Sequence, residues 1–433
     1  MARTHGVQQP DFYLATFSDI HGLGGGVAVV EGLGAALRDC GLSTLLLGAA
    51  RQTTATVRQD PSVRRLNLRG DVPAWLWRVR HWLVPRVLTA SLRQLPPPRR
   101  AFVGVNPLWV VGARRAWPDV PVAFVFVALL SNCLPFTWGR RPTLWQRISL
   151  KAVRRTERRA LRLADQIIAP TRQAREELEA FCPDVRGRIA VCTYGCQTPP
   201  ADPDLRARQR RTLGLGAADV MLLAIGVCDR NKGFDLALRE MRQVDRRARL
   251  FLIGAGPQRR CWQQLAAEAG LEDRVRLVEP QPALAPWYAA ADCVLSTSHY
   301  DTFPYVVLEA MCCGRPVVVP RHAPPLVYSG VAELIRENGG GALYDRTRPG
   351  ALADCLNRLV RDAELRVGLG RAARETALRS LRWDRCVQTL LSVAGVAVGG
   401  AAPGRTPAAR PLPMAGALLS AGQHGACFPR GVT

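Results

Sequence analysis

One stretch of the chain, from Asp292 to Pro320, constrains the fold more than any other part of the sequence. It begins with an apolar run of strand length, breaks at a polar loop that carries Asp301, and continues as a short helix that carries Glu309. Gly314 stands where the helix ends, and the β-branched run that follows predicts a second buried strand. Buried strands that alternate with helices predict a doubly wound α/β fold.

The same stretch predicts a binding site. Asp301 lies just before a helix whose first N–H groups have no acceptor within the helix, and such a helix start attracts phosphate. The carboxylates of Asp301 and Glu309 can accept hydrogen bonds from sugar hydroxyls. The arrangement therefore indicates a nucleotide-sugar site.

The two acids are separated by seven residues, and Glu309 opens the run EAMCCGRPVVV; together they resemble the signature of glycosyltransferase family 4. The resemblance implies the GT-B fold, with two Rossmann-like domains facing across a cleft, and sugar transfer with retention of anomeric configuration. It also implies that Asp301 and Glu309 contact the donor, together with Phe303, Pro304 and Tyr305. The sequence departs from the family at Asp301, where Glu is usual and the side chain is one methylene longer.

The segment GVCDRNKGFD, residues 226–235, resembles the family segment whose basic residues neutralise the donor diphosphate. Lys232 supports this interpretation, because the sequence has only two lysines among its 59 basic residues and places one of them here. Val227 stands where the family often has arginine, and we expect Arg230 to supply that charge. The resemblance makes Lys232 a catalytic residue beside the two acids; the alternative is a surface lysine without a role.

The first half of the chain opens as strand, glycine turn, helix and strand. A dinucleotide fingerprint does not fit this opening, because Val27 occupies the third glycine position and no acid follows the second strand. In family 4, a glycine-rich loop at this place faces the donor phosphates and the acceptor. Gly24, Gly25 and Gly26 match that loop; the alternative is a tight turn alone.

A third segment resembles the family on the acceptor side, where His-Asp precedes a Pro-Phe-Thr turn. Here Ser131 and Asn132 occupy the His-Asp positions, while the turn remains. This departure keeps open a second hypothesis, a non-catalytic GT-B protein that binds a nucleotide-sugar or acts as a scaffold. A third hypothesis is an epimerase or a phosphorylase of the same architecture. The scarcity of lysines disfavours a phosphorylase, which needs a lysine-bound pyridoxal cofactor.

The chain divides into an acceptor-side Rossmann-like domain at 1–200 and a donor domain at 214–380. A polar, proline-bearing segment at 196–211 is the predicted hinge linker. By resemblance, 381–397 is a terminal helix that crosses back to the first domain. The remainder, 398–433, is rich in Gly, Ala and Pro and is predicted to be disordered.

The formal charge of +24 favours acidic partners, but we expect no nucleic-acid partner because no recognised nucleic-acid motif accompanies the charge. Two segments suit an anionic membrane surface. One contains Trp75, Trp77 and Trp82 interleaved with cations, and the alternative for it is a half-buried helix. The other is an arginine-rich amphipathic helix at 144–164, for which the alternative is a solvated face.

Thirteen scattered cysteines, a start without signal-peptide character and no long apolar run predict a cytoplasmic protein, attached peripherally to the inner face of the plasma membrane. We expect no metal and no cofactor, because Lys232, Arg230 and the helix start after Thr302 can meet the diphosphate charge. The expected partners are a nucleotide-sugar donor and a glycan or lipid-linked acceptor, in cell-surface or exported polysaccharide synthesis.

Overall fold

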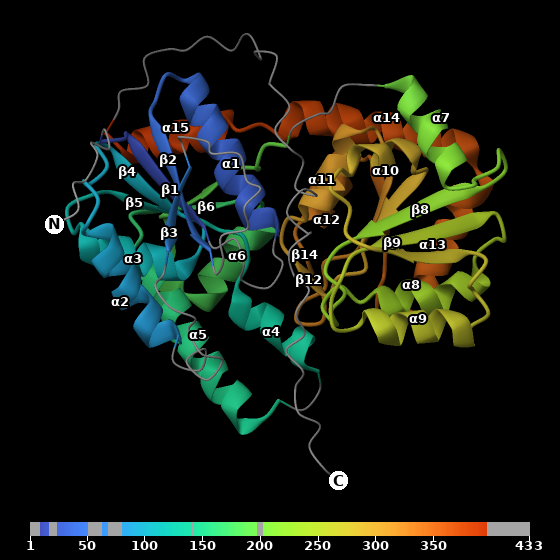
Figure 1. Cartoon of the computed structure of the whole chain (residues 1–433), viewed down its shortest axis with the longest axis horizontal. Helices are drawn as coiled ribbons and strands as arrows, with labels where there is room; N and C mark the ends of the chain where they lie inside the picture. The colour runs from blue at the N-terminus through green and yellow to red at the C-terminus, as the bar shows by residue number, and fades with distance from the viewer. Residues whose placement is uncertain are drawn as a thin grey trace.

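A computed structural model describes residues 9–16, 24–50, 63–67, 80–139, 142–196 and 202–395. These residues form two α/β domains that lie side by side, each built on a parallel sheet with helices packed on it (Figure 1). The tryptophans predicted to face a membrane, Trp75 and Trp77, lie outside the described residues, as do the side chain of Trp82 and the predicted tail at 398–433.

The first sheet has seven strands in the order β3-β2-β1-β4-β5-β6-β7, and every neighbouring pair is parallel. The strand order reverses between β1 and β4, and ligands of open α/β sheets bind at the carboxyl ends of strands at such a reversal. The strands are β1 (Phe12–Thr16), β2 (Thr44–Ala50), β3 (Val63–Asn67), β4 (Ala101–Gly104), β5 (Val122–Val125), β6 (Gln166–Ala169) and β7 (Ile189–Val191).

The second sheet has the order β10-β9-β8-β11-β13-β15, again all parallel, and reverses between β8 and β11. A separate two-stranded sheet pairs β12 with β14. The strands are β8 (Val220–Ile225), β9 (Ala248–Ile253), β10 (Val275–Val278), β11 (Cys293–Leu295), β12 (Tyr300–Asp301), β13 (Val317–Pro320), β14 (Tyr328–Ser329) and β15 (Gly341–Tyr344).

The helices of the first domain are α1 (Gly24–Asp39), α2 (Arg80–Leu92), α3 (Pro107–Ala116), α4 (Leu130–Trp138), α5 (Leu144–Leu163), α6 (Arg172–Phe181) and the 3-10 turn η2 (Pro183–Val185). Those that follow are α7 (Pro203–Thr212), α8 (Phe234–Glu240), η3 (Met241–Gln243), α9 (Arg259–Glu268), α10 (Ala285–Ala290), α11 (Tyr305–Cys312), α12 (Val331–Asn338), α13 (Ala351–Arg361), α14 (Ala363–Ser380) and α15 (Asp384–Val393). In the described part of the chain, no helix is both long enough and apolar enough to cross a membrane.

Helices α13 and α14 close the second domain and meet at Asp362. Asp362 has an extended backbone, with φ −108° and ψ 101°, which ends α13. Its side chain accepts the N–H of Leu365 and so caps the start of α14. Asp362 therefore separates the two helices.

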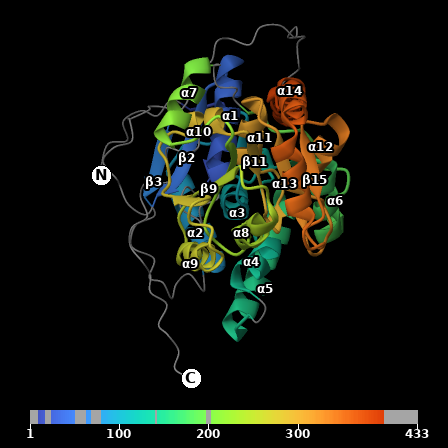
Figure 2. The same cartoon turned by 90° about the vertical axis from the view of Figure 1, so that its right-hand side faces the viewer.

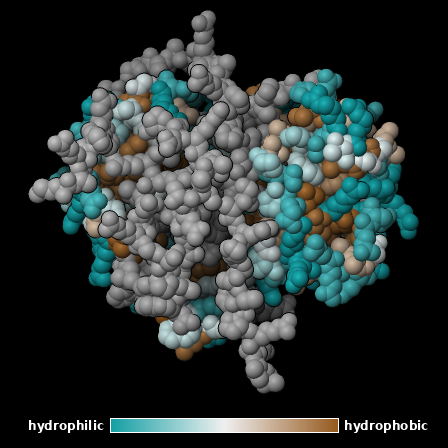
Figure 3. All heavy atoms as spheres, in the orientation of Figure 1, coloured by the Kyte–Doolittle hydropathy of each residue, from teal (hydrophilic) through white to brown (hydrophobic). Residues whose placement is uncertain are grey.

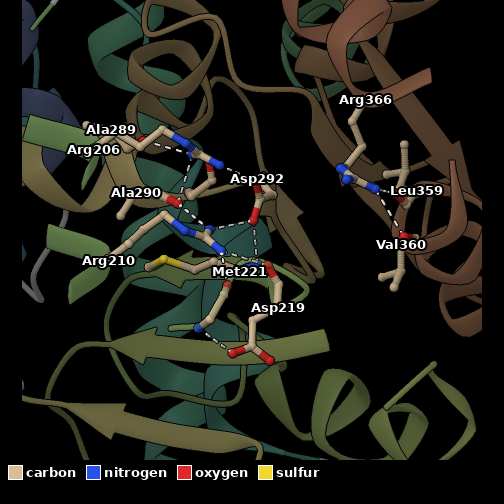
Figure 4. A network of polar contacts seen from close by, with 12 residues as sticks. Arg206, Arg210, Asp219, Met221, Ala289, Ala290, Asp292, Leu359, Val360 and Arg366 are labelled. Atoms are coloured by element: carbon tan, nitrogen blue, oxygen red, sulfur yellow. Dashed lines mark hydrogen bonds and ion pairs between the residues drawn. The ribbon is translucent and has the colours of Figure 1, made fainter. Parts of the chain in front are cut away.

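The predicted hinge linker is wrong over most of its length, because residues 203–212 form helix α7. Arg206 and Arg210 of α7 both pair with the carboxylate of Asp292 at the start of β11 (Figure 4). Burial alone would raise the pKa of Asp292, but the two arginines and the N–H of Met221 hold it below its usual value. These contacts make α7 part of the second domain.

The segment after α14 lies against the first domain. Trp383 stacks on Tyr194, with ring centroids 5.9 Å apart and planes 15° from parallel. Its indole also covers Gly32 of α1 and Gly195, where a Cβ would stand 2.7 and 2.3 Å from indole carbons. One continuous buried cluster therefore runs from the first sheet through Tyr194 into the second sheet.

Candidate functional site

The loop from Gly226 to Gly233 follows β8, at the reversal point of the second sheet. The stem of Lys232 crosses Gly226, where a Cβ would lie 3.1 Å from Cε of the lysine. Gly233 has φ +59°, and a Cβ there would lie 2.9 Å from the carbonyl oxygen of Thr297. The two glycines thus let the loop and the Lys232 stem pack closely against neighbouring groups.

Lys232 and Asp301 form an ion pair across the reversal point, with Nζ 2.7 Å from Oδ2. Only 19% of the lysine side chain and 20% of the aspartate side chain are exposed. Burial alone would lower the pKa of Lys232, but the Asp301 carboxylate outweighs burial and raises it. The lysine is therefore held in its charged form. Asp229 lies close by and accepts the backbone N–H of Lys232 at 2.9 Å.

Asn231 fixes the loop against β12, and the sequence analysis did not single it out. Its amide donates to the carbonyl of Tyr300 and accepts the N–H of Tyr300, both at 3.0 Å. Asn231 is only 5% exposed, so this two-way contact aligns the residue before Lys232 with the residue before Asp301. The spacing of the sequence carried no signal for this role, because the partners are 69 positions apart.

Helix α11 begins at Tyr305 with Pro304 as its N-cap. The side chains of Phe303 and Tyr305 pack against the first domain: Phe303 is 6% exposed and meets Tyr194 edge to face, and the Tyr305 hydroxyl donates to the carbonyl of Gly195. The backbone N–H groups at the start of α11 are therefore the groups of this segment that can bind a ligand.

Glu309 lies on α11 and is 5% exposed. The hydroxyl of Tyr288 donates to its Oε2 at 2.7 Å. Burial raises the pKa of Glu309 to about 7, against the opposing effect of the tyrosine hydrogen bond. Glu309 is thus a carboxyl group whose charge changes near neutral pH.

The first domain meets this site through helix α4 and the residues around it. The N–H of Leu129 donates to the hydroxyl of Tyr300 at 2.8 Å, and the hydroxyl of Thr302 donates to the carbonyl of Val127. The exposed Arg230 reaches Gly139 at the end of α4, where a Cβ would lie 2.8 Å from its guanidinium. Val127 and Leu129 follow β5, and Tyr300 and Thr302 follow β11, so the carboxyl ends of these two strands face each other.

The remaining predicted residues lie in the first domain. Gly24, Gly25 and Gly26 form the first turn of α1, and a Cβ on Gly26 would lie 3.2 Å from Oγ1 of Thr16 at the end of β1. This turn therefore lies at the reversal point of the first sheet. Ser131 is fully buried, and the amide of Asn132 donates to Glu177 at 2.7 Å. The N–H of Ser131 and the side-chain amide of Asn132 thus donate to glutamates inside the first domain.

Among the described residues, no group of three or more His, Cys, Asp or Glu side chains is arranged to hold a metal ion. The sequence does contain one Asp-x-Asp triplet, at residues 202–204. Asp202 in this triplet is the N-cap of α7 and accepts the N–H of Leu205 at 3.0 Å. That aspartate therefore serves as a helix cap.

The structure thus brings Lys232, Asp301 and the start of α11 together at the reversal point of the second sheet. The glycine turn of α1 lies at the reversal point of the first sheet. A cation and free N–H groups can bind phosphate oxygens, and carboxylates can accept sugar hydroxyls. The arrangement suits a phosphorylated sugar ligand.

Residues 206–376 match the family model described as glycosyl transferases group 1. The D-inositol 3-phosphate glycosyltransferase of Xylanimonas cellulosilytica is 31% identical over 55% of this chain and 58% of that protein. The enzyme of the same name from Thermomonospora curvata is 34% identical over 53% of this chain and 56% of that protein. The chain therefore spans little more than half the length of these curated relatives.

Solved structures match over more of the chain. Sucrose-phosphate synthase from Thermosynechococcus elongatus aligns with a TM-score of 0.70 at 21% identity, covering 89% of this chain and 98% of that one. WaaG, a glycosyltransferase involved in lipopolysaccharide biosynthesis, aligns with a TM-score of 0.70 at 15% identity, covering 88% and 99%. Anabaena HepE in complex with UDP aligns at 0.67 and 18% identity, covering 89% and 99%. The predicted GT-B architecture of two Rossmann-like domains is confirmed.

Proposed function

We propose that this protein is a glycosyltransferase that moves a sugar from a nucleotide-sugar donor to an acceptor. The observation that carries the proposal is the Lys232–Asp301 ion pair at the reversal point of the second sheet, beside the start of α11. Ligands bind at such points in open α/β sheets. The match of residues 206–376 to the group 1 model supports the proposal, since it covers the same loops.

Each residue of the site has a role in the proposed reaction. Lys232, Arg230 and the N–H groups at the start of α11 stabilise the negative charge that develops on the leaving diphosphate. Asp301 and Glu309 accept hydroxyls of the transferred sugar and the donor ribose. In this proposal the reaction needs no metal ion, because Lys232, Arg230 and the helix start meet the charge of the diphosphate. It proceeds with retention of anomeric configuration, as the resemblance to family 4 implies.

The acceptor is proposed to be a phosphate-bearing or lipid-linked glycan precursor in cell-surface or exported polysaccharide synthesis. The formal charge of +24 favours such an anionic acceptor. The relatives named D-inositol 3-phosphate glycosyltransferase make D-inositol 3-phosphate an acceptor to include in the first assays.

The test is a thermal-shift panel of UDP-, GDP- and ADP-sugars, followed by transfer assays with the donor that stabilises the protein. A ligand at a hundred times its dissociation constant stabilises the protein by about 2.7 kcal/mol, which a melting curve resolves. Product analysis by NMR then gives the anomeric configuration. The absence of stabilisation by every nucleotide-sugar would contradict the proposal.

A second candidate is a GT-B protein that binds a nucleotide-sugar without transferring the sugar. It is favoured by one observation. Asn132 occupies an acceptor-side position of the family, but its side-chain amide donates a hydrogen bond to Glu177 inside the first domain. In that case the panel would find a stabilising nucleotide-sugar, but no acceptor would receive the sugar.

We also propose peripheral attachment to the anionic inner face of the plasma membrane through α5. Figures 1 and 2 show α5 projecting from the first domain, and Figure 3 shows hydrophobic atoms at this tip. Leu144, Trp145 and Ile148 are 71%, 57% and 47% exposed in its first two turns. The exposed residues that follow on α5 are all basic: Lys151, Arg154, Arg155, Arg158, Arg159 and Arg162. An apolar tip beside a basic face is complementary to anionic lipid.

A further inference from the structure

Helix α4 lies against the Lys232–Asp301 pair. The thiol of Cys133 on α4 is buried, and its pKa is raised to about 12 by burial and then by the nearby charges of Asp229 and Asp301, while Lys232 opposes the shift. Three residues further along, the ring of Phe136 stacks on His299, with centroids 5.1 Å apart. The position of α4 therefore determines whether Cys133 and Phe136 lie next to the ion pair and its loop.

The start of α4 is held by side chains of other elements. Its N-cap residue, a leucine, makes no side-chain cap. Instead, the N–H of Ser131 donates to Oε1 of Glu157 on α5 at 3.2 Å. The amide of Asn132 donates to Oε1 of Glu177 on α6 at 2.7 Å. Two carboxylates, from two different helices, thus hold the first turn of α4.

Among the residues that the structure describes, no cation forms an ion pair with either carboxylate. Glu157 is 2% exposed, and its Oε2 lies beside the hydroxyl of Ser131 without a hydrogen bond to any described residue. The group of like charge that faces Glu157 is Glu177, which in turn faces the hydroxyls of Tyr300 and Tyr328. The two arginines of α6 pair with other acids. Glu157 is buried and Glu177 is half-buried, so ionising both of these neighbouring carboxyl groups without a nearby cation is unfavourable.

The direction of the pH dependence follows from this environment. Burial raises the pKa of Glu157 and of Glu177 to about 7, against the opposing hydrogen bonds that each accepts. An acid with a raised pKa binds its proton more tightly when packed than when open to water. The packed arrangement is therefore most stable below the ordinary glutamate pKa, weakens as the pH rises toward 7, and changes little above that.

We propose that Glu157 and Glu177 are positioning residues that hold α4 beside the Lys232–Asp301 pair in their protonated state, so that α4 opens more readily as the pH rises. The proton released on opening passes to solvent. This inference rests on the contacts of α4 and does not depend on the proposed activity.

The test is hydrogen exchange of the α4 amides in the ligand-free protein, from about pH 5.5 to about pH 8, with each rate divided by its intrinsic rate. We expect protection of α4 to fall roughly ten- to thirtyfold over this range for each group that titrates. Amides of β8 report global unfolding and serve as the internal reference. Glu176→Gln is the matched control, because Glu176 is exposed on α6.

The double variant Glu157→Gln/Glu177→Gln separates a proton-dependent role from a merely structural one. Its neutral amides still accept from Ser131 and Asn132, so α4 should stay protected and lose its pH dependence. Protection of α4 that does not change with pH in the unmodified protein overturns the proposal, and this outcome is decisive even if the double variant fails to fold. An unchanged pH dependence in a folded double variant also overturns it. No nucleotide is used, so neither result bears on the proposed activity.

Discussion

Replacing Lys232 by alanine should weaken nucleotide binding and destabilise the second domain through two separable effects. The substitution removes an ammonium group 2.7 Å from Oδ2 of Asp301, and 20% exposure leaves that carboxylate largely covered by protein. Loss of a charged hydrogen bond costs about 1.5–3 kcal/mol. The melting temperature should therefore fall by roughly 2–4 °C for each kcal/mol lost in a domain of this size. The same group, aimed at a diphosphate, corresponds to roughly a tenfold to hundredfold loss of affinity.

The assay combines denaturant unfolding with titration of the nucleoside diphosphate that stabilises the protein best, without its sugar. Asp301→Asn in the Lys232→Ala background removes the unpaired carboxylate charge, so it should recover part of the stability. It should not recover the affinity, because the diphosphate still lacks its cation. Lys151→Ala is the matched control, since Lys151 is the other lysine of the chain and is exposed on α5.

Two results would refute this reasoning. If Lys232→Ala binds the nucleoside diphosphate as tightly as the Lys151→Ala control, Lys232 is not a diphosphate ligand. If the double variant is no more stable than Lys232→Ala, the ion pair does not explain the loss of stability.

Three further predictions follow from the site and from α5. Burial raises the pKa of Glu309 to about 7, and only the ionised carboxylate accepts hydroxyls with both oxygens, so nucleoside affinity measured by calorimetry should strengthen as the pH rises through 7. Glu309→Gln should remove this pH dependence of the affinity, and an unchanged dependence in the variant would rule out a direct contact. Turnover with the true donor and acceptor should persist in excess EDTA, and a rate that collapses and returns with magnesium or manganese would contradict the assignment of Lys232 and Arg230 as the charge-stabilising groups. Sedimentation should show binding to anionic vesicles that weakens at high salt, and Ile148→Ser should reduce it; equal binding to neutral vesicles would exclude the electrostatic attachment.

The sequence by itself determined the features that depend on neighbouring residues. Apolar runs of strand length, separated by helices and glycine turns, predicted the two parallel sheets, because period and turn chemistry are local properties. Position along the chain also indicated that Lys232 and Asp301 each follow a strand of the second sheet. Strand ends on either side of an order reversal must lie near each other, so this part of the site was predictable.

Only the tertiary structure decided which distant groups meet and which are covered. Arg206 and Asp292, 86 positions apart, place α7 in the second domain, where the polar composition of the segment had indicated a linker. The side-chain amide of Asn132 donates a hydrogen bond to Glu177, although the position of Asn132 in the sequence had predicted a contact on the acceptor side of the cleft. The protonation of Glu309 depends on how much protein covers it. Residue spacing does not encode burial or contact across long separations, since both arise only when remote elements pack together.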